Sequence, residues 1–172
     1  MPTSADQFQK LYPVVFGWIT ATLAASAANA RTVGSQNFPR LPLYFGRDVL
    51  ASAKFVVADR LPMPPLSSIG LTQFADFERA EFDAITYLDT FFIRAHRAND
   101  EGLYFHELTH VIQWKILGPE RFLLDYATGL ETRGYRDSPL EAMAYEAEQR
   151  FRIGESFNAE QLVARRLQET SC

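Results

Sequence analysis

One segment limits the fold more than any other, because the helix that it predicts is apolar on nearly every side. Its apolar residues are Leu103, Phe105, Leu108, Val111, Ile112, Trp114, Ile116 and Leu117. A helix of this kind is buried, so other elements must enclose it. The same segment carries the ionisable residues His106, Glu107 and His110. Because a buried ionisable group needs a partner or a metal ion, the segment predicts a site inside the core.

The three ionisable residues form the pattern H-E-x-x-H. Residues four apart lie one above the other on a helix, so His106 and His110 can bind one metal ion. Glu107 lies about 100° further round, within reach of a water on that metal. Zinc lowers the pKa of such a water, and a carboxylate that is not a ligand can take its proton. The pattern predicts a Zn²⁺ site with Glu107 as general base; a pair of surface histidines is the alternative.

Two histidines and a water leave tetrahedral zinc one protein ligand short. A second helix is predicted over residues 139–151, with Ser138 as its N-cap and Pro139 as its first residue. Glu141 borders the apolar stripe of this helix and is the predicted third ligand, with Glu148 on the same edge as the alternative. Glu141 also fits a capping box with Ser138, in which it would only close the helix end.

Five other residues are weaker candidates for the site. His96 lies at the end of a predicted strand, and Asp137 directly precedes the second helix. Gln113 lies on the metal-facing side of the first helix, where it would hold substrate or water, or would only border a crowded pocket. Tyr135 and Tyr145 carry hydroxyls of the kind that stabilise an oxyanion, although such residues are more often core aromatics.

The H-E-x-x-H pattern followed by a helical glutamate resembles the gluzincin branch of the zincin metallopeptidases. The run from His106 to Trp114, with Pro139-Leu140-Glu141 and Ala144-Tyr145, is similar to small uncharacterised bacterial metallopeptidase domains and to the minigluzincins. This resemblance covers roughly residues 53–151. It implies a short twisted sheet beside the metal helix, with an edge strand that holds an extended peptide.

The resemblance further implies a zinc peptidase that acts on a peptide or protein substrate. Larger gluzincins carry an aspartate where Tyr145 stands, and that aspartate orients a ligand histidine. Either Tyr145 takes a catalytic or orienting role here, or another group orients the imidazole. Two alternatives remain: a non-catalytic binding or regulatory module with a zincin fold, and a latent peptidase blocked by its own terminal segment.

The remaining segments predict an α+β fold, mostly helical, with a small twisted antiparallel sheet of about three strands beside the H-E-x-x-H helix. The predicted strands are residues 54–58, 84–87 and 91–93, of which the last two form a hairpin. Residues 61–68, rich in proline, predict an extended loop. The expected organisation is one zincin-like domain over residues 1–172. It comprises an N-terminal helix (1–30), a metallopeptidase core (53–151) and a C-terminal helix (158–168). Other predicted helices are residues 43–51, 100–117, 121–130 and 139–151.

Residues 11–30 are largely apolar and end in Ala28-Asn29-Ala30, as a signal peptide does. The preceding residues are only weakly basic, however, and Leu11, Val15, Ile19 and Leu23 share one face of a helix. We therefore expect a packed helix, no stable membrane insertion and a cytoplasmic protein; secretion is the alternative.

Composition excludes some partners. The net charge is −4 and no run of Lys or Arg exists, so nothing indicates nucleic-acid binding. The single cysteine, Cys172, gives no disulfide framework, which fits a reducing compartment. A content of 47 % hydrophobic residues supplies a core for one domain, and the sequence does not indicate an oligomeric state.

Overall fold

A computed structural model describes residues 4–170 of the chain, with side chains from Asp6 onward. Cys172 therefore lies outside the described residues. The helices are α1 Ser4–Ser26, α2 Arg47–Ser52, α3 Ala75–Arg79, α4 Glu101–Leu117, α5 Pro119–Arg133, α6 Pro139–Arg152 and α7 Ala159–Glu169. The strands are β1 Arg31–Thr32, β2 Lys54–Ala58, β3 Ala84–Tyr87 and β4 Thr90–Arg94. This α+β architecture confirms the predicted fold class.

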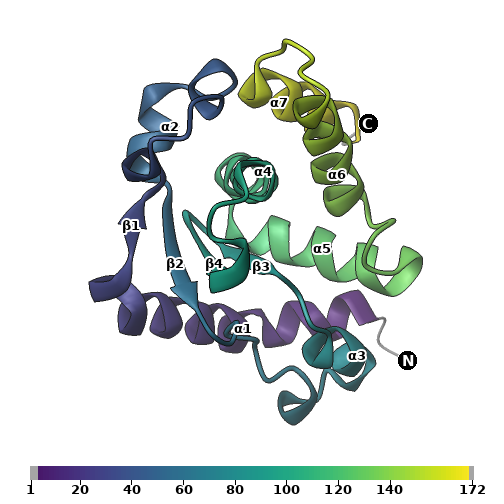
Figure 1. Ribbon diagram of the computed structural model, residues 1–172. Helices are drawn as coiled ribbons and strands as arrows, with labels where there is room; N and C mark the ends of the chain where they lie inside the picture. The colour runs from purple at the N-terminus through teal and green to yellow at the C-terminus, as the bar shows by residue number, and fades with distance from the viewer. Residues whose placement is uncertain (1–3, 171–172) are drawn as a thin grey trace.

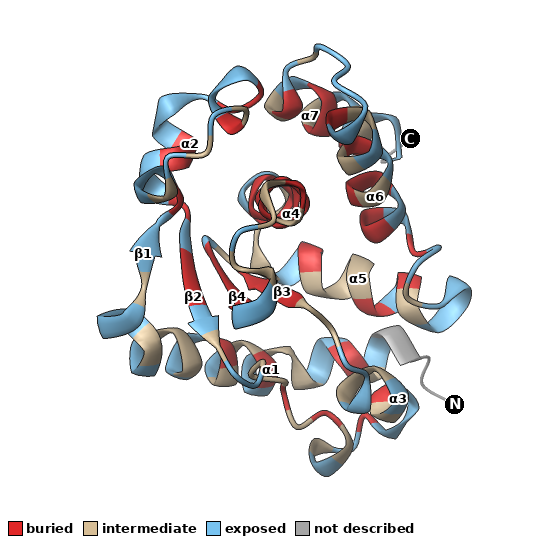
Figure 2. Cartoon of the chain, viewed as in Figure 1, coloured by how far each residue is buried: buried red, intermediate tan, exposed pale blue. Residues whose placement is uncertain are grey.

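Helix α4 lies at the centre of the molecule, as its apolar surface predicts. Figure 1 looks along this helix, and the other elements form a ring around it. Every residue from Tyr104 to Trp114 is buried, including the ionisable ones, and Figure 2 shows α4 largely in the colour of buried residues. Asp100 caps the first turn by accepting hydrogen bonds from the Gly102 and Leu103 amides. Gly118 ends the helix with a φ of 75°, which favours glycine.

The sheet differs from the prediction in strand number and in direction. It has four strands in the order β1-β2-β4-β3, and β2 pairs with β4 in parallel, so the sheet is mixed. The hairpin of β3 and β4 and the position of β2 are as predicted. Strand β1 was missed because it is two exposed residues long and pairs with only Lys54 and Phe55. The parallel pair is possible because residues 59–89 supply the long crossover that parallel strands require.

The N-terminal helix α1 packs onto the fold through a narrow stripe. Phe8, Val15 and Ile19 are buried, whereas Leu11 and Leu23 are partly buried. Figure 1 shows α1 passing beneath the sheet and α5, and α1 contacts α5. By length and composition, residues 6–29 are also apolar enough to cross a membrane, a test that buried helices and signal sequences pass too. One cluster of buried side chains extends from Phe8 to Leu167.

The helices that flank the centre differ slightly from their predicted bounds. Helix α5 continues past Leu130 to Arg133, and α2 begins only at Arg47, after a 3₁₀ turn at Leu41–Leu43. Asn158 caps α7 as predicted, because its Oδ1 accepts a hydrogen bond from the Gln161 amide at 2.9 Å. The predicted loop at residues 61–68 has no helix or strand before Ser67.

Candidate metal centre

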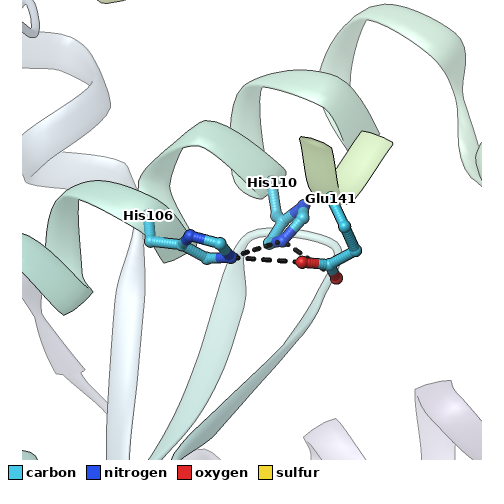
Figure 3. Close-up of side chains that lie close together, drawn as sticks. All are labelled: His106, His110 and Glu141. Carbon is cyan, nitrogen blue, oxygen red and sulfur yellow. Dashed lines mark hydrogen bonds and ion pairs between the residues drawn. The ribbon is translucent and has the colours of Figure 1, made fainter. Parts of the chain in front are cut away.

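The structure brings together the three residues predicted to bind a metal. Helix α4 supplies His106 and His110 from successive turns, and the first turn of α6 supplies Glu141 (Figure 3). The two histidine Nε2 atoms lie 3.2 Å apart. Glu141 Oε2 lies 3.3 Å from Nε2 of His106, and Oε1 lies 3.3 Å from Nε2 of His110. This buried group can hold a metal ion.

The spacing of the donor atoms fits a small tetrahedral ion. Bonds of about 2.0–2.1 Å at the tetrahedral angle separate two ligand atoms by about 3.3–3.4 Å. The three distances between donors, 3.2, 3.3 and 3.3 Å, lie close to that value. The triangle of His106, His110 and Glu141 therefore offers donor separations of the size found between zinc ligands, with each Nε2 in contact with a different oxygen of Glu141.

Each imidazole has an acceptor behind it. Nδ1 of His106 lies 3.1 Å from Oε2 of Glu148, and Nδ1 of His110 lies 2.8 Å from Oε1 of Gln113. The Gln113 amide is itself fixed, because its Nε2 donates to the Leu140 carbonyl at 3.0 Å. Both Nδ1 atoms are therefore assigned as donors, which leaves a lone pair on each Nε2 of a neutral ring. Those lone pairs point at each other and at a carboxylate, an arrangement that a cation stabilises.

The pKa values of the two histidines and of Glu141 also indicate that the site favours a positive charge. Burial lowers the pKa of His106, but the Glu141 and Glu148 carboxylates outweigh it and raise the pKa to about 10. Burial likewise opposes a raised pKa for His110, yet the charge of Glu141 raises it. Burial would raise the pKa of Glu141, and the two imidazoles instead hold it well below its usual range. Without a metal ion, protons on the histidines would supply this positive charge; with one bound, the rings would be neutral.

Glu107 lies beside the triangle and is not part of it. Its side chain is buried, and the Thr86 hydroxyl of β3 donates a 2.6 Å hydrogen bond to its Oε2. Burial raises the pKa of Glu107, with both histidines acting in the opposite direction. Glu107, His110 and Glu141 all line one pocket. The carboxylate is therefore held close to the donor atoms with only one oxygen engaged by Thr86.

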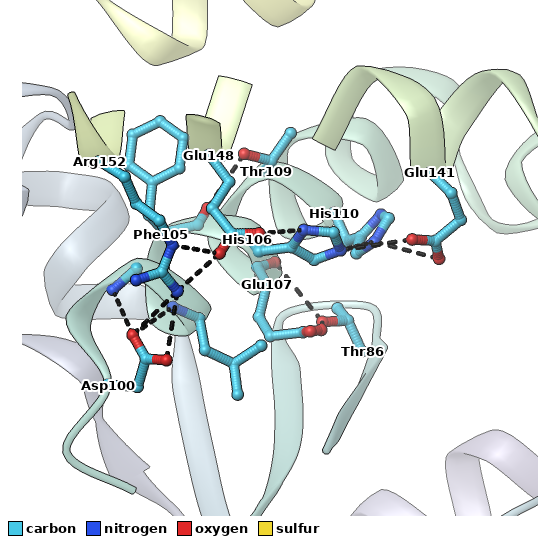
Figure 4. A network of polar contacts seen from close by, with 12 residues as sticks. Thr86, Asp100, Phe105, His106, Glu107, Thr109, His110, Glu141, Glu148 and Arg152 are labelled. Atoms are coloured by element: carbon cyan, nitrogen blue, oxygen red, sulfur yellow. Dashed lines mark hydrogen bonds and ion pairs between the residues drawn. The ribbon is translucent and has the colours of Figure 1, made fainter. Parts of the chain in front are cut away.

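A chain of charged groups supports His106 from behind (Figure 4). Glu148 accepts a 2.7 Å hydrogen bond from Arg152, whose guanidinium also contacts Asp100 at 3.1 Å. The same Asp100 caps α4, so the network connects α6 to the beginning of α4. Gly102 leaves room for the Arg152 guanidinium, because a Cβ at this position would overlap Cζ of Arg152. Glu148, the alternative ligand, contacts Nδ1 rather than Nε2 and is an orienting group.

Three tyrosines surround the triangle in different ways. Tyr126 of α5 donates a 2.6 Å hydrogen bond to Oε1 of Glu141. Tyr145 packs its ring against His106, with centroids 4.6 Å apart. Tyr126 and Tyr135 line the pocket shared by Glu107 and His110, whereas Tyr145 is not among its lining residues. The sequence analysis did not single out Tyr126; the signal that could have found it is that a buried tyrosine hydroxyl usually needs a partner.

Other candidates lie elsewhere. The side chain of His96 is 62 % exposed and pairs with Asp83 at 3.2 Å. Asp137 is exposed and does not belong to the ligand group. Ser138 stands at the N-cap of α6, but its hydroxyl donates to the Tyr135 carbonyl instead of closing a capping box. Glu141 is therefore directed to the histidines and not to its own helix end.

Comparisons with models of protein families, with curated proteins and with solved structures find no match for this chain.

Proposed function

We propose that the protein is a zinc-dependent peptidase in which Glu107 is the general base for hydrolysis of a peptide or protein substrate. One observation carries the proposal: Glu107, fixed by Thr86, lies next to a ligand triangle of His106, His110 and Glu141 without joining it. Within residues 4–170, three ligating groups gather there. A structural zinc site uses four protein ligands, whereas three leave a position for water.

The donor set favours zinc over other common ions. Two imidazoles and one carboxylate suit Zn²⁺, while Mg²⁺ and Ca²⁺ prefer oxygen ligands. When bound, zinc would supply Lewis-acid chemistry, lowering the pKa of a water and polarising a substrate carbonyl. His106 and His110 would bind it through Nε2, in ring orientations fixed by Glu148 and Gln113.

The residues of the chain then have separate roles in the reaction. Thr86 engages Oε2 of Glu107, which leaves Oε1 to accept a proton from the attacking water. Glu107 would later deliver that proton to the leaving amine. Tyr126 holds Glu141 in place through its hydroxyl. Of the tyrosines weighed for the oxyanion, Tyr135 lines the pocket with Glu107, while a catalytic role for Tyr145 stays a prediction.

The test compares Glu107→Gln with the wild type in two measurements. Elemental analysis should find about one zinc per chain in both proteins, since Glu107 makes no metal bond. Turnover of a diverse peptide library should fall by about 10²–10⁴-fold, the usual contribution of a general base. The exposed Glu169→Gln is the control and should keep full turnover. Equal turnover in wild type and Glu107→Gln would exclude the mechanism.

A latent peptidase is the second candidate, because the site is covered. The four residues of the site are only 2–5 % exposed: His106, Glu107, His110 and Glu141. Three residues of α1 line the pocket in which Glu107 lies. In a latent enzyme, loosening α1 would raise turnover. In an enzyme that uses α1 to bind substrate, the same change would lower it.

A further inference from the structure

A surface pocket lies where α6 ends and α7 begins (Figure 1). Its volume of about 310 Å³ falls within the range of ordinary ligand sites. Six residues line it: Arg150, Phe157, Asn158, Gln161, Leu162 and Arg165. Two of them carry a positive charge, none carries a negative charge, and none belongs to the candidate metal centre.

We infer that this pocket binds a small organic anion, a phosphate monoester or a dicarboxylate that carries an apolar group. The inference goes beyond the proposed peptidase and does not depend on it, because no lining residue is a predicted metal ligand or general base. Two guanidinium groups select the charge of the ligand, and two apolar side chains select the character of the rest of it.

The first guanidinium, that of Arg150, is held in place on two sides. Its Cζ lies 4.4 Å from the centre of the Phe157 ring, and its Nη2 donates a 2.6 Å hydrogen bond to Oε1 of Glu155. A guanidinium carries five N–H groups in a fixed fork, so Glu155 leaves most of them available. Arg150 is therefore already oriented when a ligand arrives, and it is only partly buried.

The second guanidinium, that of Arg165, has no partner in the described part of the chain. Arg165 is exposed, and among residues 4–170 its side chain makes no hydrogen bond or ion pair. The next residue, Arg166, is by contrast paired with Glu146 of α6. A carboxylate or phosphate can accept two parallel hydrogen bonds from an arginine that is free in this way.

Asn158 and Gln161 add uncharged donors beside the two arginines. Oδ1 of Asn158 accepts a 2.9 Å hydrogen bond from the Gln161 backbone amide as the cap of α7, which leaves its Nδ2 group to donate. The side chain of Gln161 is exposed and can turn its own amide toward a ligand. The polar part of the pocket therefore consists of donors, as an anion requires.

The apolar side of the pocket is fixed by the core. The Phe157 ring contacts Phe105 of α4 at a centroid distance of 5.9 Å and Tyr44 at 5.1 Å. Leu162 is buried in the same core cluster. Inorganic phosphate would fill only part of this volume and leave both side chains uncovered, whereas an attached apolar group would cover them. The occupant therefore combines an anionic head with an apolar body.

Two matched pairs of variants test the pocket. Arg165→Gln removes the unpaired charge, and Arg166→Gln removes its neighbour, which does not line the pocket. Gln161→Glu places a carboxylate among the lining residues, and Gln168→Glu places one on the exposed end of α7. All four variants lower the net charge by the same amount, so a general charge effect would be common to them. Urea denaturation identifies any variant that fails to fold.

Calorimetric titration compares phenyl phosphate, phenylmalonate, inorganic phosphate and uncharged phenol. We expect saturable binding of phenyl phosphate or phenylmalonate at one per chain, and the tighter of the two identifies the anionic head. Arg165→Gln and Gln161→Glu should weaken it about 10–100-fold, the usual effect of losing a charged hydrogen bond. Arg166→Gln and Gln168→Glu should bind as the wild type does, and phenol should not saturate.

A repeat with protein stripped of metal separates this pocket from the candidate centre, because phosphates and carboxylates can also bind a metal ion. Binding that persists and still responds to Arg165→Gln belongs to the pocket, whatever Glu107→Gln does to peptide turnover. Binding that disappears with the metal would overturn the inference. So would equal affinity in all variants, no saturation by about 10 mM, or inorganic phosphate binding as tightly as phenyl phosphate.

Discussion

The two imidazoles of the candidate centre are oriented by chemically different groups. His106 faces the Glu148 carboxylate, and His110 faces the neutral Gln113 amide. A carboxylate behind a ligand histidine makes its other nitrogen more basic, whereas an amide only fixes the ring. His106 should therefore be the more sensitive of the two ligands to loss of its partner.

Glu148→Gln should keep the fold and weaken zinc binding by about 10–100-fold, as loss of an outer partner usually does. Competition against a fluorescent zinc chelator measures the affinity. Glu146→Gln, two residues away on the same helix, is the control and should bind zinc as the wild type does, because its carboxylate faces Arg166 and not the histidines. If both variants bind equally well, the carboxylate behind His106 has no role.

Stability of the metal-free protein should depend on pH through the same residues. The pKa of His106 rises from 6.5 to about 10 on folding. Its contribution to the stability of the folded protein is therefore complete below pH 6.5 and is lost toward pH 10. The pKa of Glu141 falls below 4.5, so its contribution is present above pH 4.5 and lost in more acidic solution. Urea denaturation with a chelator should therefore give maximal stability between pH 4.5 and 6.5.

Zinc changes this profile because it competes with protons for the imidazoles. Zinc-loaded protein should gain stability relative to metal-free protein as pH rises above 6.5. A metal-free protein whose stability is constant from pH 5 to 9 would contradict the charge state assigned to His106.

The three candidate ligands could be predicted because their placement follows helix geometry within one element. His106 and His110 share a face of α4, and Glu141 borders the apolar stripe of α6. Their partners were not predictable in the same way. Thr86 meets Glu107 across 21 residues, and Glu148 meets His106 across 42. Such pairs depend on how the elements pack, which no local periodicity encodes.

Among the elements, local signals were sufficient where they were strong. Asp100 and Gly118 define the ends of α4, and the two short runs of β-branched and aromatic residues on either side of Leu88-Asp89 indicate the hairpin. The parallel pairing of β2 with β4 depends instead on tertiary contacts, since a strand alone does not reveal its partner's direction. The continuation of α5 past Leu130 to Arg133 was missed as well.

Gly129 marks the closest approach of α5 to the beginning of α6. A Cβ there would lie 2.9 Å from Cβ of Ser138 and 3.0 Å from Cδ of Pro139. Gly129→Ala should force the helices apart and cost about 1–3 kcal/mol of stability, as overpacking does. Because Glu141 follows directly, zinc affinity should fall as well.

Gly17→Ala is the matched control for this change. Gly17 lies inside α1, and a Cβ added there would meet nothing within 4 Å, so alanine is accommodated. Alanine favours a helix interior by about 1 kcal/mol over glycine, and the variant should be slightly more stable. Urea denaturation compares the two, and a stabilised Gly129→Ala would contradict the close contact.

At the scale of the whole molecule, α1 is part of both the core and the pocket. Ile19→Asp would bury a carboxylate at a position that is 0 % exposed, with a large loss of stability expected. Thr20→Asp, on the exposed side, should be tolerated. If α1 only preceded the fold as a leader, the two variants would unfold at the same urea concentration.

Turnover of the folded fraction of Ile19→Asp also separates two roles of α1. We expect turnover to fall, because Ile19 lines the same pocket as Glu107 and a carboxylate placed there would disturb the candidate centre. A rise in turnover relative to Thr20→Asp would favour the latent peptidase instead.

The packing of α1 against α5 has a consequence for synthesis on the ribosome. Helix α1 ends at Ser26 and α5 ends at Arg133, so the apolar stripe of α1 emerges long before its partner exists. At about 5–20 residues per second, that interval lasts roughly 5–20 s. During this time Phe8, Val15 and Ile19 lack the packing surface of α5. The nascent chain therefore presents an uncovered apolar helix to any factor that surveys the ribosomal exit.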